Sequence, residues 1–160
     1  MYSSQQGGCF LGKADNMVKP LDICAIPAQM IEVVWSQVEP LLFRVVDRNP
    51  DDICPHVTKQ KLLAGDTLLI SISDGAEIVA INILEVQELD TGLRVLYIPI
   101  TAGTRMREWL EPFLAVAKRI AKDYKCVELR GMSVRKGWLN TLGKHGWESA
   151  YETIKCKVGE

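Results

Sequence analysis

The segment TLLISISDGAEIVAINILEVQELDTGLRVLYIPI, residues 67–100, decides the fold class. Apolar or β-branched residues dominate three runs within it, at residues 67–73, 76–86 and 93–100. The Asp-Gly pair at 74–75 and the Asp-Thr-Gly sequence at 90–92 are turn signals between these runs. The segment therefore predicts an antiparallel meander of three strands.

Helical spacing flanks the meander on both sides. Apolar side chains recur every three or four residues over residues 27–46, where Pro40 predicts a kink or two consecutive helices. A shorter helix follows, with Thr58 as its expected N-cap and Gly65 at its end. After the meander we expect a long helix, a short strand, a short helix and a last strand, at residues 106–121, 126–129, 136–144 and 151–157. The order ααβββαβαβ describes an α/β (α+β) mixed sheet with an antiparallel N-terminal meander.

Length and composition fit one folded domain behind a short arm. Of the 160 residues, 48% are hydrophobic and 24% are charged, close to the averages of globular proteins. Residues 1–20 lack periodicity and are rich in Ser, Gln and Gly, so we expect an arm there and the domain over residues 21–160. No apolar run reaches the roughly 18 residues of a membrane span, so we expect a soluble protein.

Cysteine, histidine and basic residues point to no disulfide framework, metal or nucleic acid. The five cysteines are odd in number and form no CxxC pair. His56 and His145 lie in different segments without other ligands at metal spacing. Basic residues gather near the end of the long predicted helix, at Lys118, Arg119, Lys122 and Lys125. No aromatic residues interleave them, so they suit the helix dipole better than a nucleic-acid partner.

Two segments after the meander carry a family resemblance. Residues 124–129, YKCVEL, lead from the long helix into a strand, and residues 137–148, GWLNTLGKHGWE, form a helix and the corner before the last strand. With the order of elements, they resemble the GNAT N-acetyltransferase fold over residues 27–158. The stretch Arg135-x-Gly137-Trp138 is similar to small GNAT-like proteins of tailed bacteriophages, which implies a place in the virion or the host cytoplasm.

The resemblance implies acetyl-CoA as cofactor and a phosphate-binding turn after the meander. In the family this turn usually reads Q/R-x-x-G-x-G/A, because small residues let successive N–H groups at a helix N-terminus face the pyrophosphate. Here Ile100 opens the turn, Gly103 is its one glycine, and Arg105 stands where Gly or Ala is usual. Thr104, Arg105 and Arg107 remain as donors that could pair with phosphates.

The family resemblance also implies a tyrosine on the last helix, which protonates the departing thiolate, and a carboxylate base on a central strand. Leu142 stands at the tyrosine position and has no proton to give. Glu128 is the nearest candidate for the catalytic base, and Glu85 and Glu88 are weaker ones.

Two functions remain open at this point. One is a non-catalytic structural or assembly component of a phage, whose arm contacts a protein partner through Cys9, Phe10 and Leu11. The other is an active acetyl-CoA-dependent N-acetyltransferase, which polarises the thioester carbonyl with a backbone N–H near residues 97–100. The departure of the turn from the family pattern and the leucine at position 142 favour the first function.

Overall fold

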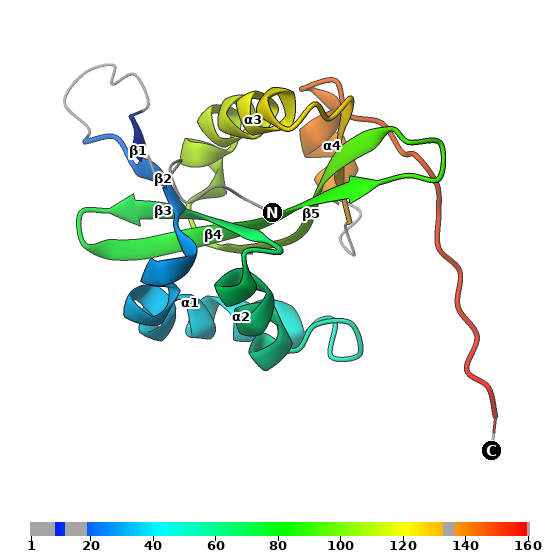
Figure 1. Cartoon of the computed structure of the whole chain (residues 1–160), viewed down its shortest axis with the longest axis horizontal. Coiled ribbons are helices and arrows are strands. Elements are labelled where there is room, and N and C mark those ends of the chain that lie inside the picture. The colour runs from blue at the N-terminus through cyan, green and yellow to red at the C-terminus, as the bar shows by residue number, and fades with distance from the viewer. Residues whose placement is uncertain (1–8, 12–18, 133–136, 160) are drawn as a thin grey trace.

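The computed structural model describes residues 9–11, 19–132 and 137–159, and one mixed β-sheet lies at its centre (Figure 1). The sheet follows the order of the chain through the strands β1 (Cys9–Leu11), β2 (Asp22–Ile26), β3 (Leu68–Asp74), β4 (Glu77–Glu88), β5 (Arg94–Gly103) and β6 (Glu128–Gly131). Neighbouring strands are antiparallel except β5 and β6, which are parallel. The expected fold class, a mixed sheet with an antiparallel meander, is confirmed.

The meander forms where the sequence predicts it. Asp74 pairs with Glu77 around the first turn, where Gly75 has φ 60°. In the second turn Gly92 has φ 82°, and the Leu89 N–H donates to the carbonyl of Leu93 at 2.8 Å. Both glycines adopt the positive φ that such turns favour.

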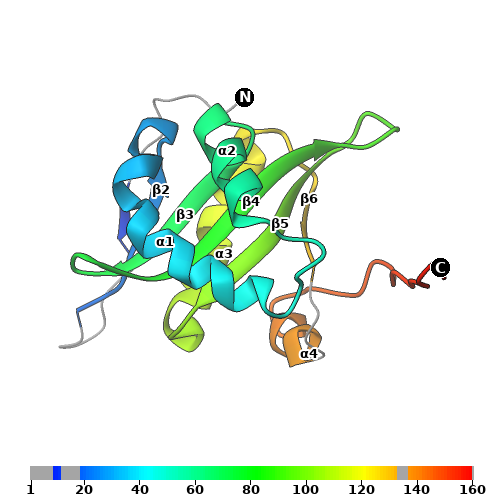
Figure 2. The same cartoon turned by 90° about the horizontal axis from the view of Figure 1, so that it is seen from below.

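Two helices cover one face of the sheet (Figure 2). After the short 3-10 helix η2 (Ala28–Met30), they are α1 (Ile31–Val46) and α2 (Pro55–Ala64). Trp35, Val38 and Leu42 of α1 join a buried cluster with Ile81 and Ile83 of β4. The helical periodicity of residues 27–46 therefore has its cause in this contact.

Two details of this layer differ from the sequence prediction. The helix α1 continues through the exposed Pro40, so the predicted division into two helices does not occur. Thr58 is not an N-cap: α2 begins at Pro55, and the Thr58 hydroxyl donates to the carbonyl of Cys54 at 3.0 Å. Proline fits the first helical position because no intrahelical partner exists for an N–H there. Gly65 ends α2 with φ 76°, as predicted.

The opposite face is covered by the helix α3 (Met106–Asp123). Trp109, Phe113 and Ala117 pack there with Ala80 and Leu84 of β4. The rings of Trp109 and Phe113 meet edge to face, with centroids 5.9 Å apart. The strand β4 therefore serves two cores, one on each face.

The two ends of the predicted order need correction. The strand β2 was not predicted, because it has only five residues, of which Ile23 and Ala25 are the buried ones. The strand predicted over residues 151–157 does not form. After the helix α4 (Gly137–Gly143) the described chain runs away from the sheet, and residues 148–159 are exposed without regular structure (Figure 1). A strand needs a paired neighbour, and none lies beside this segment in the part of the chain that the structure describes.

The cysteines also differ in part from the expectation of no disulfides. Cys24 is disulfide-bonded, and in the backbone register it stands opposite Cys9 of β1. Cys54, Cys126 and Cys156 are free thiols. Within the described residues, no helix is both long and apolar enough to cross a membrane.

The free thiols should differ in reactivity. Burial raises the pKa of the Cys126 thiol, an effect that nearby Arg94 only partly opposes. Cys54 and Cys156 are exposed. Because the thiolate is the reacting species, iodoacetamide near pH 8 should alkylate Cys54 and Cys156 before Cys126, as read by peptide mass spectrometry. The preference should vanish in denaturant, and early labelling of Cys126 in the native protein would contradict the packing.

Candidate functional site

The strands β5 and β6 run side by side over four residues and then separate. Their parallel pairing begins where Val95 faces Glu128 and ends where Ile98 faces Gly131. Beyond that point β5 continues beside β4 as far as Gly103. The final residues of β5 therefore have β4 on one side and, among the described residues, no strand on the other. This opening follows residues 97–100, where the sequence predicts a backbone N–H for the thioester carbonyl.

An irregularity in β5 marks the point of separation. The register between β4 and β5 shifts between Ile83 and Glu85, and the extra residue lies in β5 at residues 98–99. Such a bulge bends a strand and increases its twist. Pro99 has no N–H to contribute to a sheet, so it is tolerated at a bulge.

The close approach of Gly103 to β4 explains why this position is glycine. Its φ is 130°, and a Cβ placed on it would overlap the Cα of Ala80 and the carbonyl oxygen of Val79. The space that a side chain would occupy is thus filled by the neighbouring strand. This glycine lets two strands pack, and the space it leaves is not open to a ligand.

Both backbone polar groups of Thr104 are already bonded within the protein. Its N–H donates to the carbonyl of Val79 at 3.0 Å, and its hydroxyl lies 3.5 Å from the same oxygen. Its carbonyl accepts a 2.8 Å hydrogen bond from the indole Nε1 of the buried Trp109. Thr104 is therefore fixed between β4 and α3, and its N–H does not face a phosphate position.

Arg105 is held by two carboxylates. Its guanidinium donates to Asp74 at 2.7 Å from the first meander turn, and to Glu108 in the first turn of α3. These partners raise the pKa of Arg105 further above its usual range. Its backbone has φ 60°, an uncommon conformation for a non-glycine residue. An anion approaching this guanidinium meets two negative charges as well.

The two remaining turn candidates differ from each other. The side chain of Ile100 is buried among the residues beneath α1, so it belongs to the core. Arg107 is exposed in the first turn of α3. Of the two arginines proposed for phosphate binding, Arg105 is ion-paired, whereas Arg107 takes part in none of the described ion pairs.

These contacts occupy one N–H group and one guanidinium of the turn that the sequence predicts for a pyrophosphate. Such a site needs consecutive unbonded N–H groups and a net positive surrounding. The Thr104 N–H is bonded to β4, the glycine faces β4, and Arg105 is neutralised by Asp74 and Glu108.

Glu128 lies far along the sheet from this turn. It pairs with Val95, eight residues before Gly103, so about 26 Å of extended strand separates them. Its carboxylate bonds Arg130 at 2.9 Å, and its side chain is 55% exposed. Its role as a catalytic base stays a prediction.

Sequence reasoning missed a pair next to the bulge. Tyr97 stands opposite Glu85 in the register of β4 and β5. Burial raises the pKa of Tyr97 above its usual value, and Tyr151, Glu85 and Asp52 raise it further. Only Glu85 was noted in the sequence, because the pairing depends on the bulge. Leu142 is partly buried and packs against the core beneath α3.

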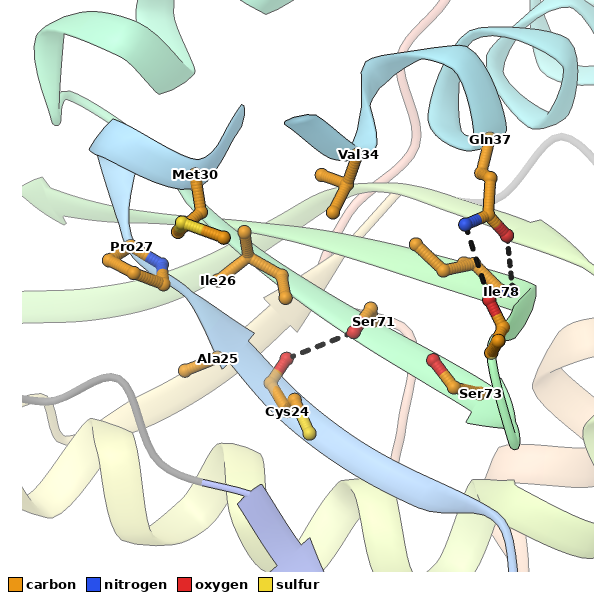
Figure 3. Close-up of a pocket in the computed structure, with 11 residues that line it drawn as sticks. Cys24, Ala25, Ile26, Pro27, Met30, Val34, Gln37, Ser71, Ser73 and Ile78 are labelled. Atoms are coloured by element: carbon orange, nitrogen blue, oxygen red, sulfur yellow. Dashed lines mark hydrogen bonds between the residues drawn. The ribbon is translucent and has the colours of Figure 1, made fainter. Parts of the chain in front are cut away.

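A groove of about 390 Å³ lies elsewhere, between β2, β3 and the start of α1 (Figure 3). Ile26, Met30 and Val34 form its apolar walls. Gln37 closes one end by donating to the carbonyl of Ala76 at 3.2 Å and accepting from the N–H of Ile78 at 2.8 Å. Two of its lining residues, Ser73 and Ile78, adjoin Asp74 and Val79, the partners of Arg105 and Thr104 in the turn after β5.

The arm contacts the domain through one short strand. Cys9, Phe10 and Leu11 form β1, which pairs with β2 of the same chain. Residues 1–8 and 12–18 of the arm lie outside the described residues. In the described part of the chain, no group of three or more His, Cys, Asp or Glu residues could hold a metal ion.

Comparison with known proteins identifies the fold. No protein-family model and no curated protein matches the sequence. The structure is similar to a ribosomal-protein-alanine N-acetyltransferase from Brucella melitensis, with a TM-score of 0.65 and 12% identity, covering 87% of this chain and 99% of that one. An aminoglycoside acetyltransferase from an uncultured soil metagenomic sample gives 0.66 and 11%, covering 87% and 99%. A Trypanosoma brucei acetyltransferase gives 0.62 and 11%, covering 86% and 99%.

This chain has the GNAT acetyltransferase fold. At this level of identity the likeness establishes the fold and leaves the chemistry to the residues themselves.

Gly103→Ala should destabilise the protein strongly. The added Cβ overlaps β4, and the backbone conformation disfavours any side chain, so the free energy of unfolding should fall by about 3 kcal/mol or more. Gly92→Ala is the matched control: its φ is 82°, but nothing lies within 4 Å of the new Cβ. It should lose only about 1–2 kcal/mol. Equal losses in urea denaturation would contradict the close approach at Gly103.

Tyr97 should titrate above the usual range of tyrosine. Its raised pKa means that the folded state favours the neutral phenol, so this stabilisation is present below about pH 10 and is lost as the pH rises through the raised value. Tyr97→Phe should remove a high-pH component from the ultraviolet titration of phenolate absorbance. Tyr151→Phe should lower the pKa of Tyr97, and an unchanged value would contradict their proximity.

Proposed function

We propose that this GNAT-fold protein is a non-catalytic structural or assembly component, and that it does not use acetyl-CoA. The observation that carries the proposal is that the turn after β5 is bonded to other parts of the protein. The Thr104 N–H is bonded to Val79, and the Arg105 guanidinium is bonded to Asp74 and Glu108. To bind a pyrophosphate, the turn would have to break these contacts.

More specifically, we propose that the protein has this role in a phage virion. It is supported by the similarity of Arg135-x-Gly137-Trp138 to small phage proteins and by the arm, in which Cys9, Phe10 and Leu11 are the proposed partner contacts. The short β1 that they form lies at the edge of the sheet, where a further strand can pair.

The second candidate is an active acetyl-CoA-dependent N-acetyltransferase. It is favoured by the separation of β5 from β6 and by the bulge at residues 98–99, where an N–H could polarise a thioester carbonyl. In that case Glu85, opposite Tyr97, is a better-placed base than Glu128, because it adjoins the bulge.

Thermal unfolding with and without acetyl-CoA separates the two functions. A ligand at 100 times its dissociation constant adds about 2.7 kcal/mol of stability, which raises the melting temperature of a domain of this size by about 5–10 °C. We expect no shift at millimolar acetyl-CoA, with an active GNAT-fold enzyme as the positive control. A shift that disappears in Arg105→Glu would overturn the non-catalytic role.

A further inference from the structure

The described part of the arm is joined to the sheet by a short strand that contains a cysteine. The three residues of β1 pair with β2 in a register that places Cys9 opposite Cys24. Cys24 is disulfide-bonded, and three of the five cysteines are free thiols, so Cys9 is the partner that remains for Cys24. Directly opposite residues of antiparallel strands have Cα atoms about 4.5–5.5 Å apart, a separation that a disulfide spans.

The pairing of β1 with β2 is weak without this bond. β1 is the outermost strand of the sheet and, among the described strands, pairs with β2 alone (Figure 1). Ordering the backbone of a residue costs about as much free energy as a backbone hydrogen bond returns, so a three-residue strand is marginal by itself. The bond closes a loop of about 15 residues, and a cross-link of this length favours the docked arm by about 100-fold.

The domain, by contrast, keeps β2 in place without the bond. All five residues of β2 also pair with β3. Ile23 and Ala25 belong to the core beneath α3, and Ile26 packs against the core beneath α1 and α2. Cys24 belongs to neither of these described cores: it is partly exposed and lines the groove between β2, β3 and α1 (Figure 3).

These features are typical of an exchangeable disulfide. The resistance of a disulfide to reduction depends on how strongly the protein holds its two thiols together once they are reduced. Cys24 is fixed within β2, whereas in the described structure Cys9 is held by a three-residue strand. The exposed free thiols of Cys54 and Cys156 also show that the bond is not part of a framework that pairs every cysteine.

We propose that the disulfide between Cys9 and Cys24 is a redox switch that docks the arm on β2. The thiolate of a small thiol such as glutathione attacks one sulfur, and the other sulfur leaves as a thiolate and takes up a proton. A second thiol then attacks the mixed disulfide, which releases the remaining cysteine and leaves the reductant oxidised to its own disulfide. Two electrons and two protons thus pass to the protein, which ends with two thiols.

Reduction frees both the arm and the outer edge of β2. The N–H and C=O groups on that edge can then pair with an extended strand of another protein. The three residues of β1 are also the proposed partner contacts of the arm, and in the oxidised form they are engaged with β2. Their use by a partner rests on the proposed assembly role, whereas the switch itself does not.

Peptide mapping without reduction identifies the bond. Trypsin should release peptide 1–13 joined to peptide 14–44 from the full chain after its free thiols are blocked, because Lys19 precedes a proline and is not cleaved. An unlinked peptide 14–44, or its linkage to a peptide that contains Cys54, Cys126 or Cys156, would overturn the proposed pairing.

Hydrogen–deuterium exchange of the full chain then tests the switch. In millimolar reduced glutathione we expect the bond to open and the β2 amides that face β1 to exchange about 100-fold faster, while the amides of β4 stay protected. Cys9→Ser should show the fast exchange with and without glutathione, and the matched control Cys54→Ser should respond like the unmodified protein.

Three outcomes of this experiment would contradict the switch. A bond that persists in millimolar glutathione is structural. Unchanged exchange in β2 after reduction means that the arm stays docked without the bond. A loss of protection in β4 after reduction means that the bond holds the whole domain together instead of the arm.

Discussion

The burial of β4 on both faces is the constraint on which the rest of the structure depends. Ala80 and Leu84 belong to the core beneath α3, whereas Ile81 and Ile83 belong to the core beneath α1 and α2. A strand removed from water on both faces must have its N–H and C=O groups paired on both edges, because an unpaired buried polar group is costly. β3 and β5 supply these partners, so the meander and the two helical layers form one unit.

The same constraint determines the turn after β5. Because β5 stays paired with β4 as far as Gly103, the exposed residues that follow contact β4 and the first meander turn. Thr104 is bonded to Val79, and Arg105 reaches back to Asp74. The turn after β5 thus joins α3 to the meander.

On the other side of β5 the sheet is incomplete. β6 is a four-residue strand with one described neighbour, and the residues after Trp147 run away from it.

The sequence by itself determined the meander, the turns at Gly75 and Gly92, the end of α2 at Gly65 and the long amphipathic α3, because each depends on neighbours a few residues apart. It also named the turn after β5. It did not reveal β2, whose five residues are too few for a periodic pattern, and it predicted a last strand that has no partner within the described chain. Only the tertiary structure decided what the turn can do. The bonds of Thr104 to Val79 and of Arg105 to Asp74 join residues 25 and 31 positions apart, and such contacts exist only after the strands have paired.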